Sequence, residues 1–304
     1  MDRLCVIINP YSQGGRTGTK TNYYLKKLKE NNFKFDSYTS NSKSHSDTLF
    51  KKLFNEYDSF LAIGGDGLVH EMIQNLNGNK TKTLAIAPAG NGNMFARHHN
   101  INSFDDAIHA LKKDNRISID LVKITYVSED EKKKTIYSHC IFGLGYIERV
   151  ISHASRTYRK IGKPFCYPLS SFTASLNIDD FTSEITIDKK KLKFKNTNSI
   201  MCLNHGKVGP FNLAEDVDDT DGFLDYVIYH DTGTFESWFE ILDTMLAFYR
   251  FEKRRLSGKA KKILVKLNSP KNLMVDGELL ENIVNMSAEI IPKTLNTYSL
   301  KGKD

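Results

Sequence analysis

The chain has 304 residues, of which 40% are hydrophobic and 26% are charged, and it carries a formal net charge of +7. These values are typical of a soluble globular protein that is long enough for two domains. No apolar segment approaches the roughly 20 residues that a membrane helix needs, and the first residues do not resemble a signal peptide, so a helical membrane protein is excluded.

The cysteines and the basic residues indicate the cellular compartment and the kinds of partner to expect. The four cysteines (Cys5, Cys140, Cys166 and Cys202) have no metal-ligand spacing, and we expect them to be reduced residues of a cytoplasmic protein. The positive charge has two open interpretations, a solvated surface or attraction to an anionic membrane. Nucleic acid is not expected as a partner, because the basic runs lack interleaved aromatic residues and no nucleic-acid motif is present.

Up to about residue 125 the pattern alternates between strand and helix. Strands are predicted at 4–8, 33–38, 60–63, 83–87 and 117–124, and helices at 19–31, 45–55, 68–76 and 104–112. This order predicts a parallel sheet with helices on both faces, an α/β fold.

After residue 127 the pattern changes to short β-like segments. They are predicted at 183–188, 191–196, 199–203, 223–229, 263–267, 272–275 and 287–292, with helical segments near 167–177 and 235–250. Many short strands separated by turns predict a second domain that is a β-sandwich or resembles a barrel.

Three strand-to-helix turns in the first half are rich in glycine. Residues 60–71 (FLAIGGDGLVHE) run from a buried strand into an amphipathic helix, residues 84–97 repeat the plan, and residues 4–16 open the chain with it. Glycine lets the backbone approach a ligand closely, and a helix N-terminus favours an anion such as phosphate. The carboxyl ends of parallel strands converge on one crevice, so we expect a phosphate site there, with the carboxylate of Asp66 at its mouth.

The motifs also resemble a known family. Residues 64–71 (GGDGLVHE) and 88–93 (PAGNGN) are similar to the two glycine motifs of the diacylglycerol kinase and sphingosine kinase superfamily. Further landmarks occur in the same order as in that family, at residues 9–10 (NP), 142–145 (FGLG), 221–225 (DGFLD) and 275–278 (VDGE). The resemblance spans nearly the whole chain, at the size of the compact bacterial-type lipid kinases.

This resemblance implies a two-domain lipid kinase. Residues 1–126 would form the α/β nucleotide-binding domain (NAD kinase/diacylglycerol kinase-like), and residues 127–292 the β-sandwich that binds lipid. Residues 293–304 would form a tail that returns to the first domain. By position, the implied nucleotide contacts are Asn9, Thr39, Gly64, Gly65, Gly67, Glu71, Gly90 and Asn91.

The implied reaction is phosphoryl transfer from ATP, with Mg²⁺, to a lipid hydroxyl. This reaction requires the lipid hydroxyl to lie in line with the γ-phosphate, a group that accepts its proton, and cations that balance the developing negative charge. Asp66 and Glu278 are the implied catalytic acids, and the sequence does not separate the general base from the acid near the metal. We favour Asp66 as the base. Without the resemblance, the segment 276–278 would be interpreted as a hairpin turn.

Two further sites are expected from charged segments. Arg159 matches a basic segment that reaches the phosphates in sphingosine kinases, and Lys163 stands near the position of a second arginine in that family. The turn 215–222 (EDVDDTDG) crowds carboxylates that repel one another unless they are solvated or bind a cation. Asp216, Asp219 and Asp221 are the candidate metal ligands there.

The acceptor lipid stays open. Leu68 and Asn91 stand where bacterial diacylglycerol kinases favour threonine, so diacylglycerol and a sphingoid base or ceramide are weighed equally. The alternatives are an NAD kinase and a nucleotide-binding regulator without catalysis. The expected partner is a lipid substrate at an anionic membrane surface, reached by peripheral association from the cytoplasm, and a homodimer is left open.

Overall fold

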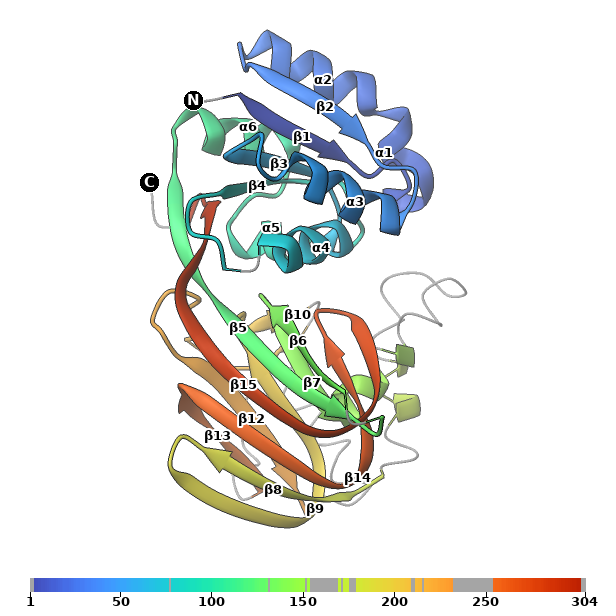
Figure 1. Ribbon diagram of the computed structural model, residues 1–304, viewed down its shortest axis with the longest axis vertical. Helices are drawn as coiled ribbons and strands as arrows, with labels where there is room; N and C mark the ends of the chain where they lie inside the picture. The colour runs from blue at the N-terminus through green and yellow to red at the C-terminus, as the bar shows by residue number, and fades with distance from the viewer. Residues whose placement is uncertain are drawn as a thin grey trace. The chain divides into compact units, whose positions relative to one another are not determined.

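The computed structural model describes residues 3–76, 78–130, 132–150, 152–153, 169–170, 172–174, 179–208, 211–214, 216–231 and 254–301. The chain divides into two compact units (Figure 1). Unit 1 comprises residues 1–121 and 291–304, and unit 2 comprises residues 122–290. The sequence-based boundaries were 126 and 292. The structural boundaries fall inside two long strands, where the sequence has no linker signal.

A parallel sheet forms the centre of unit 1. Its strands lie in the order β2 (Phe35–Thr39), β1 (Leu4–Ile8), β3 (Ser59–Gly64), β4 (Thr83–Pro88) and the end of β15 (Glu278–Tyr298). Every residue of β1 and β3 is buried. Strands that are covered on both faces have continuous apolar sequences, which is why these segments were identifiable from the sequence.

Helices cover this sheet in two groups. In chain order they are the 3₁₀ turn η1 (Ser12–Gly15), α1 (Arg16–Thr19), α2 (Thr21–Glu30), α3 (Lys43–Leu53), α4 (Asp66–Leu76), α5 (Met94–His98) and α6 (Phe104–Lys112). The rings of Tyr24 and Phe104 join α2 to α6, with 4.8 Å between their centroids. The Asn75 amide donates to Asp47 at 2.7 Å and joins α4 to α3. The predicted arrangement of a parallel sheet between helices is confirmed.

The last residues of the described chain complete this sheet. Asn296 and Thr297 of β15 pair in parallel with Thr83 and Leu84 of β4. The Thr297 hydroxyl donates to the Leu84 carbonyl at 2.8 Å, and the Ser299 amide donates to the Asn115 carbonyl at 3.0 Å.

Unit 2 is rich in antiparallel sheet. Its strands are β5 (Arg116–Ser128), β6 (Lys133–Ser138), β7 (Ile141–Gly145), β8 (Phe181–Ile187), β9 (Lys190–Leu203), β10 (Lys207–Val208), β11 (Phe211–Asn212), β12 (Leu224–His230), β13 (Arg255–Ala260), β14 (Lys262–Val275) and β15. One hydrophobic cluster, which includes Phe142, Ile185, Ile200 and Val265, forms its core.

Three strands are longer than the sequence predicted. The segments 191–196 and 199–203 belong to the single strand β9, the segments 263–267 and 272–275 belong to β14, and 287–292 is part of the 21-residue β15. The first halves of β9 and β14 pair with β8, and their second halves pair with β7. In β9 and β14, the polar residues between the two halves mark the point at which the neighbouring strand changes from β8 to β7. The sequence pattern does not distinguish such a point from a turn.

Some predicted features lie outside the described residues. These are the helix at 235–250, most of the segment 167–177, Cys166, Arg159 and Lys163. Cys5, Cys140 and Cys202 are buried and form no disulfide. Among the described residues, no helix combines the length and the apolar character that crossing a bilayer requires.

Candidate functional site

Four strand ends of unit 1 lie in register at one edge of the sheet. Ile8 at the end of β1 pairs with Thr39 of β2 and with Ile63 of β3, and Gly64 pairs with Pro88 of β4. The connecting turns are tied to neighbouring strands. The Asn9 amide donates to the Ile63 carbonyl at 3.0 Å, and the Ala89 amide donates to the Gly64 carbonyl at 2.8 Å. The turns therefore occupy the edge at which open α/β sheets bind ligands.

The two glycine turns are in direct backbone contact. A Cβ atom added at Gly65 would lie 2.9 Å from the Cα of Gly90, and one added at Gly90 would collide with the Cα of Gly65. Neither residue has a left-handed φ, so glycine is required here by the close approach of the two chains rather than by the turn conformation. Any larger residue would force the turns apart.

One side chain of the second turn and two from the segment after β1 hold the second turn in place. Asn93, with a φ of 53°, accepts from the Gly90 amide and donates to the Gly90 carbonyl, both at 2.8 Å. The Gln13 amide donates to the Gly90 carbonyl at 2.9 Å, and the buried Thr17 hydroxyl donates to the Ala89 carbonyl at 2.9 Å. The sequence analysis assigned no role to these three side chains. Gln13 and Thr17 were missed because their partners are backbone atoms distant in the chain, whereas Asn93 bonds within its own motif.

Asp66 begins α4 and is half-buried between the turns. Its Oδ1 accepts a long hydrogen bond of 3.4 Å from the amide of Phe95 near the start of α5. A Cβ atom added at Gly92 would lie 2.6 Å from its Oδ2, so Gly92 is the residue that leaves room for this carboxylate. The acid is thus fixed by both glycine motifs, at a helix N-terminus.

The remaining predicted nucleotide contacts of unit 1 lie at or near the same edge. Gly67 and Asn91 are exposed, and a Cβ atom added at Gly67 would have no neighbour within 4 Å among the residues that the structure describes. Thr39 is the exposed last residue of β2. Glu71 lies one turn into α4, and its carbonyl accepts from Asn75 at 2.8 Å. At Gly67 the protein itself does not require glycine, which leaves open space for a ligand beside Asp66.

In unit 2, the segment 276–278 forms a tight hairpin between β14 and β15. Val275 pairs with Glu278, and the two residues between them have positive φ angles, 50° for Asp276 and 93° for Gly277. This is the two-residue turn that the sequence pattern indicated. Glu278 is the partly exposed first residue of β15, so the hairpin fixes the position of this predicted catalytic acid.

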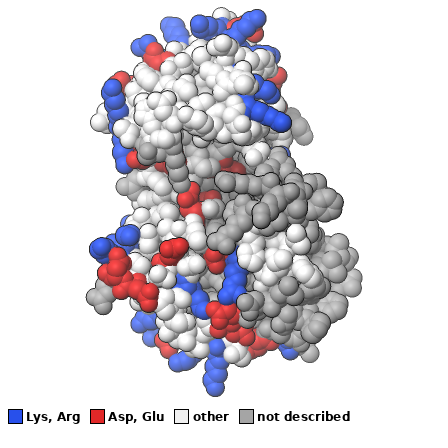
Figure 2. Space-filling view, turned by 90° about the vertical axis from the view of Figure 1, so that its right-hand side faces the viewer, with Lys and Arg blue, Asp and Glu red and all other residues white. Residues whose placement is uncertain are grey.

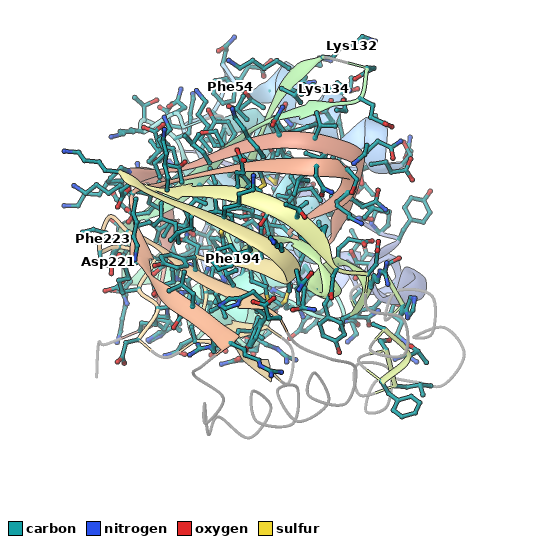
Figure 3. All side chains as sticks on the ribbon, turned by 90° about the horizontal axis from the view of Figure 1, so that it is seen from below. Phe54, Lys132, Lys134, Phe194, Asp221 and Phe223 are labelled. Carbon is teal, nitrogen blue, oxygen red and sulfur yellow. The ribbon has the colours of Figure 1, made fainter. Side chains whose placement is uncertain are left out.

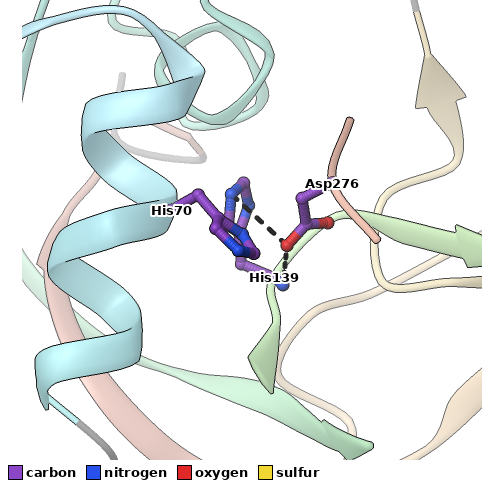
Figure 4. Close-up of side chains that lie close together, drawn as sticks. All are labelled: His70, His139 and Asp276. Atoms are coloured by element: carbon purple, nitrogen blue, oxygen red, sulfur yellow. Dashed lines mark hydrogen bonds and ion pairs between the residues drawn. The ribbon is translucent and has the colours of Figure 1, made fainter. Parts of the chain in front are cut away.

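The Asp276 carboxylate is a buried acceptor for the β6–β7 connection (Figure 4). It accepts from the Ser138 hydroxyl at 2.9 Å and from the amides of His139, Cys140 and Ile141 at 3.0 Å. The Nε2 atom of His139 lies 3.7 Å from the Asp276 Oδ2. The sequence missed this role, because the pattern Asp-Gly at a hairpin explains the turn without a buried carboxylate.

The acidic turn does not bring its three predicted metal ligands together. Asp216, Asp219 and Asp221 form no group with ligand atoms within 4.8 Å of one another. Asp219 is buried, with its Oδ2 4.0 Å from the Nε2 of His205, whereas Asp221 forms an ion pair with Lys259. The predicted ligand set therefore does not fit a cation in this arrangement.

A lysine ammonium supplies the positive charge at this turn. The Nζ of Lys259 contacts the Asp221 carboxylate, lies 3.3 Å from the Asp216 carbonyl oxygen and lies 3.7 Å from the Asp225 carboxylate. Asp221 and Phe223 are labelled at the turn in Figure 3. Burial raises the pKa of Asp225 to about 6, with Lys259 opposing the shift and Asp221 adding to it.

Comparisons with known proteins show what the chain is similar to. Residues 3–124 match the model of the diacylglycerol kinase catalytic domain. This similarity covers the amino-terminal part of the chain. A protein of Staphylococcus haemolyticus that carries the provisional name of lipid kinase is 25% identical over 260 residues, which cover 79% of this chain and 76% of that protein. A Streptococcus pneumoniae protein with the same provisional name is 23% identical over the full length of both chains.

Solved structures agree on the fold. A Bacillus anthracis protein, provisionally named a diacylglycerol kinase, superposes with a TM-score of 0.79 at 20% identity and covers 99% of this chain and 98% of its own. A second structure from the same organism, named a diacylglycerol kinase, has a TM-score of 0.73 at 17% identity. The predicted resemblance and the predicted kinase class are confirmed. The matched residues include both glycine motifs and Asp66, and a kinase domain implies ATP as the phosphoryl donor.

The two kinds of glycine in the kinase domain predict opposite effects. Gly90→Ala should lower the free energy of unfolding by about 2 kcal/mol or more, because the methyl group meets the Gly65 backbone. Gly67→Ala should change stability by less than about 0.5 kcal/mol and should weaken ATP binding about tenfold, because it fills the space beside the predicted phosphate site. Urea unfolding measures the stability of each variant, and titration with a fluorescent ATP analogue measures its affinity for the nucleotide. Normal ATP affinity in a stable Gly67→Ala protein would place the nucleotide elsewhere.

The buried Asp276 carboxylate should be a major contributor to the stability of unit 2. Asp276→Ala leaves three amides and one hydroxyl without this acceptor, so we expect the free energy of unfolding to fall by about 3 kcal/mol. Asp188→Ala is the matched control, because Asp188 also has a positive φ and accepts from two amides but is exposed. Equal losses for the two variants in urea unfolding would show that burial of the Asp276 carboxylate adds nothing.

The raised pKa of Asp225 predicts a pH-dependent stability. The native state holds this proton more tightly than the unfolded state, in which an aspartate titrates near 4, so the contribution of Asp225 falls as the pH rises from about 4 to about 6. Asp225→Asn should therefore be more stable than the wild type at pH 8, by about 1 kcal/mol after allowance for solvent screening. The difference should vanish below about pH 4. Thermal unfolding across this range measures it, and parallel profiles would contradict the assignment.

Proposed function

We propose that the protein is an ATP-dependent lipid kinase that phosphorylates the hydroxyl group of a membrane lipid, diacylglycerol or a sphingoid or ceramide-like lipid. The observation that carries this proposal is the contact of the two glycine turns, with Asp66 between them and open space at Gly67. A helix N-terminus and glycine amides favour the phosphates of a nucleotide. The acid at the same edge supplies the group that phosphoryl transfer requires.

The roles of the two acids follow from the chemistry of the reaction. Asp66 accepts the proton of the lipid hydroxyl, the hydroxyl oxygen attacks the γ-phosphorus, and the bond to the β-γ bridging oxygen breaks, releasing ADP. Mg²⁺ would supply positive charge to the phosphates of the nucleotide, and Glu278 is the acid that we assign to the metal. Asn9, Gly65, Gly90 and Asn91 position the nucleotide, and Glu71 reaches its sugar.

Unit 2 is the proposed acceptor domain. We assign its antiparallel strands to a β-sandwich that contributes the lipid site, and we keep Arg159 and Lys163 as predicted phosphate contacts. Leu68 is buried against Gly64, so its difference from the threonine of bacterial diacylglycerol kinases lies in the core of unit 1. Diacylglycerol and sphingoid acceptors therefore remain equal candidates.

Transfer of labelled γ-phosphate tests the proposal. The wild type, with ATP and Mg²⁺, should label diacylglycerol, sphingosine or ceramide in mixed micelles, and Asp66→Asn should lower the rate by about 10³-fold or more without loss of the fold. Circular dichroism and the unfolding midpoint check the fold of the variant. Near-normal turnover by Asp66→Asn would remove this acid from the mechanism.

The same assay separates the alternative functions. NAD is the soluble acceptor control, and labelled NADP would identify an NAD kinase instead. ATP binding without any labelled product would support a regulator that has lost catalysis. Glu278→Gln, compared with Asp66→Asn across a range of Mg²⁺ concentrations, distinguishes the two acids. Partial rescue by high Mg²⁺ is expected for Glu278→Gln and not for Asp66→Asn.

A further inference from the structure

The outer face of the sheet in unit 2 contains a groove of about 390 Å³ formed by β5, β6, β14 and β15. Its origin is the alternation of strand side chains. In β14, Ile263 and Val265 are buried in the core, so Lys262, Leu264 and Lys266 stand on the opposite face. We call this feature the lysine groove and define it by Lys123, Lys133, Lys262, Leu264, Lys266 and Glu289, which are among its lining residues.

Basic side chains dominate the lysine groove. Among the described residues that line it are four lysines and one acid, Glu289. Glu289 pairs with Lys262 at 3.0 Å, and no other ion pair is found for the groove lysines among the described residues. On the face drawn in Figure 2, by contrast, basic and acidic side chains are interspersed. The groove therefore carries a local excess of positive charge.

The lysine groove also exposes apolar surface. The side chain of Leu264 is 38% exposed, although it belongs to a strand that supplies the core. Val127, Thr125 and Ser287 line the same groove, so apolar and hydroxyl groups lie among the cations. The β5–β6 hairpin bears Lys132 and Lys134, which are labelled in Figure 3, and Lys132 pairs with Asp130 at 3.4 Å. A surface of this composition suits a ligand that is anionic and partly apolar.

We propose that the lysine groove docks the protein on a membrane that contains anionic phospholipid. The proposal rests on the proposed function, because a kinase whose acceptor is a bilayer lipid must reach the bilayer. The ammonium groups match the phosphates of lipid headgroups, and several lysines near an anionic surface act together. Leu264 and Val127 match the apolar boundary beneath the headgroups.

Two other occupants fit the groove less well. A second copy of the chain, placed by a twofold axis on the same surface, would bring lysines against lysines. Single-stranded nucleic acid binds through aromatic stacking platforms as well as cations, and the described residues that line the groove include no aromatic side chain. An anionic bilayer is complementary to both the charge and the apolar surface.

Vesicle sedimentation tests this docking surface without catalysis. The test variant is the triple change Lys123→Gln, Lys133→Gln and Lys266→Gln. It leaves the Lys262–Glu289 pair intact. The wild type should bind vesicles of phosphatidylcholine and phosphatidylglycerol in equal parts, should not bind phosphatidylcholine alone, and should dissociate as salt rises. We expect the affinity of the variant for the anionic vesicles to be at least about tenfold lower than that of the wild type.

The matched control removes the same charge from unit 1. Lys20, Lys29 and Lys112 are exposed there, and changing all three to Gln should leave vesicle affinity within about twofold, because they lie outside the groove. Equal losses in both triple variants would show that net charge alone binds the membrane and would overturn the proposal. Wild-type affinity in the groove variant would also overturn it.

Two further measurements separate this proposal from others. The groove variant should phosphorylate lipid dispersed in neutral detergent micelles at the wild-type rate, because none of its three changes touches the kinase site. A failure of the kinase assay with intact groove-dependent vesicle binding would reject the proposed function and leave the docking surface. A change from dimer to monomer in sedimentation equilibrium, with vesicle binding unchanged, would assign the groove to a second copy of the chain.

Discussion

The contact between the backbones of Gly65 and Gly90 is the constraint on which the proposed kinase site depends. Two strand-to-helix turns approach so closely that neither tolerates a side chain at that point. The approach brings the start of α4 and the start of α5 to the same carboxylate, Asp66. Two helix N-termini and one acid at the edge of a parallel sheet create a local field suited to a phosphate chain. The hydrogen bonds of Gln13, Thr17 and Asn93 to the backbone of the second glycine turn stabilise this close contact.

Unit 2 uses tight turns for a different purpose. The hairpin at Asp276 and Gly277 is short, so the Asp276 side chain points back into the structure and accepts from four donors of the β6–β7 connection. Glu278 follows directly and is fixed in position by the same hairpin. In the acidic turn, the Lys259 ammonium offsets the repulsion between neighbouring carboxylates. The sequence analysis had assigned this role to a metal ion. In both places groups of the protein itself stabilise a carboxylate.

Much of unit 1 could be predicted from the sequence, because its signals are local. The buried strands β1 and β3 are continuous apolar runs, and the glycines that follow them identify the turns. Unit 2 was harder to predict, because β9 and β14 exchange neighbours part-way along their length. Roles that depend on pairing between distant segments, such as that of Lys259 at the acidic turn, leave no trace in a single sequence. The role of Asp276 as a buried hydrogen-bond acceptor was missed because the hairpin turn already explained an aspartate at this position.

The pairing of β15 with β4 has a consequence for the order of events during synthesis. Unit 1 is discontinuous, since residues 291–304 belong with residues 1–121. Its sheet presents β4 as an open edge until Asn296 and Thr297 leave the ribosome. An uncovered edge strand is a template for wrong pairing, and the entire second unit is translated while it is exposed. The kinase domain is thus the first part of the chain to be made and the last to be completed.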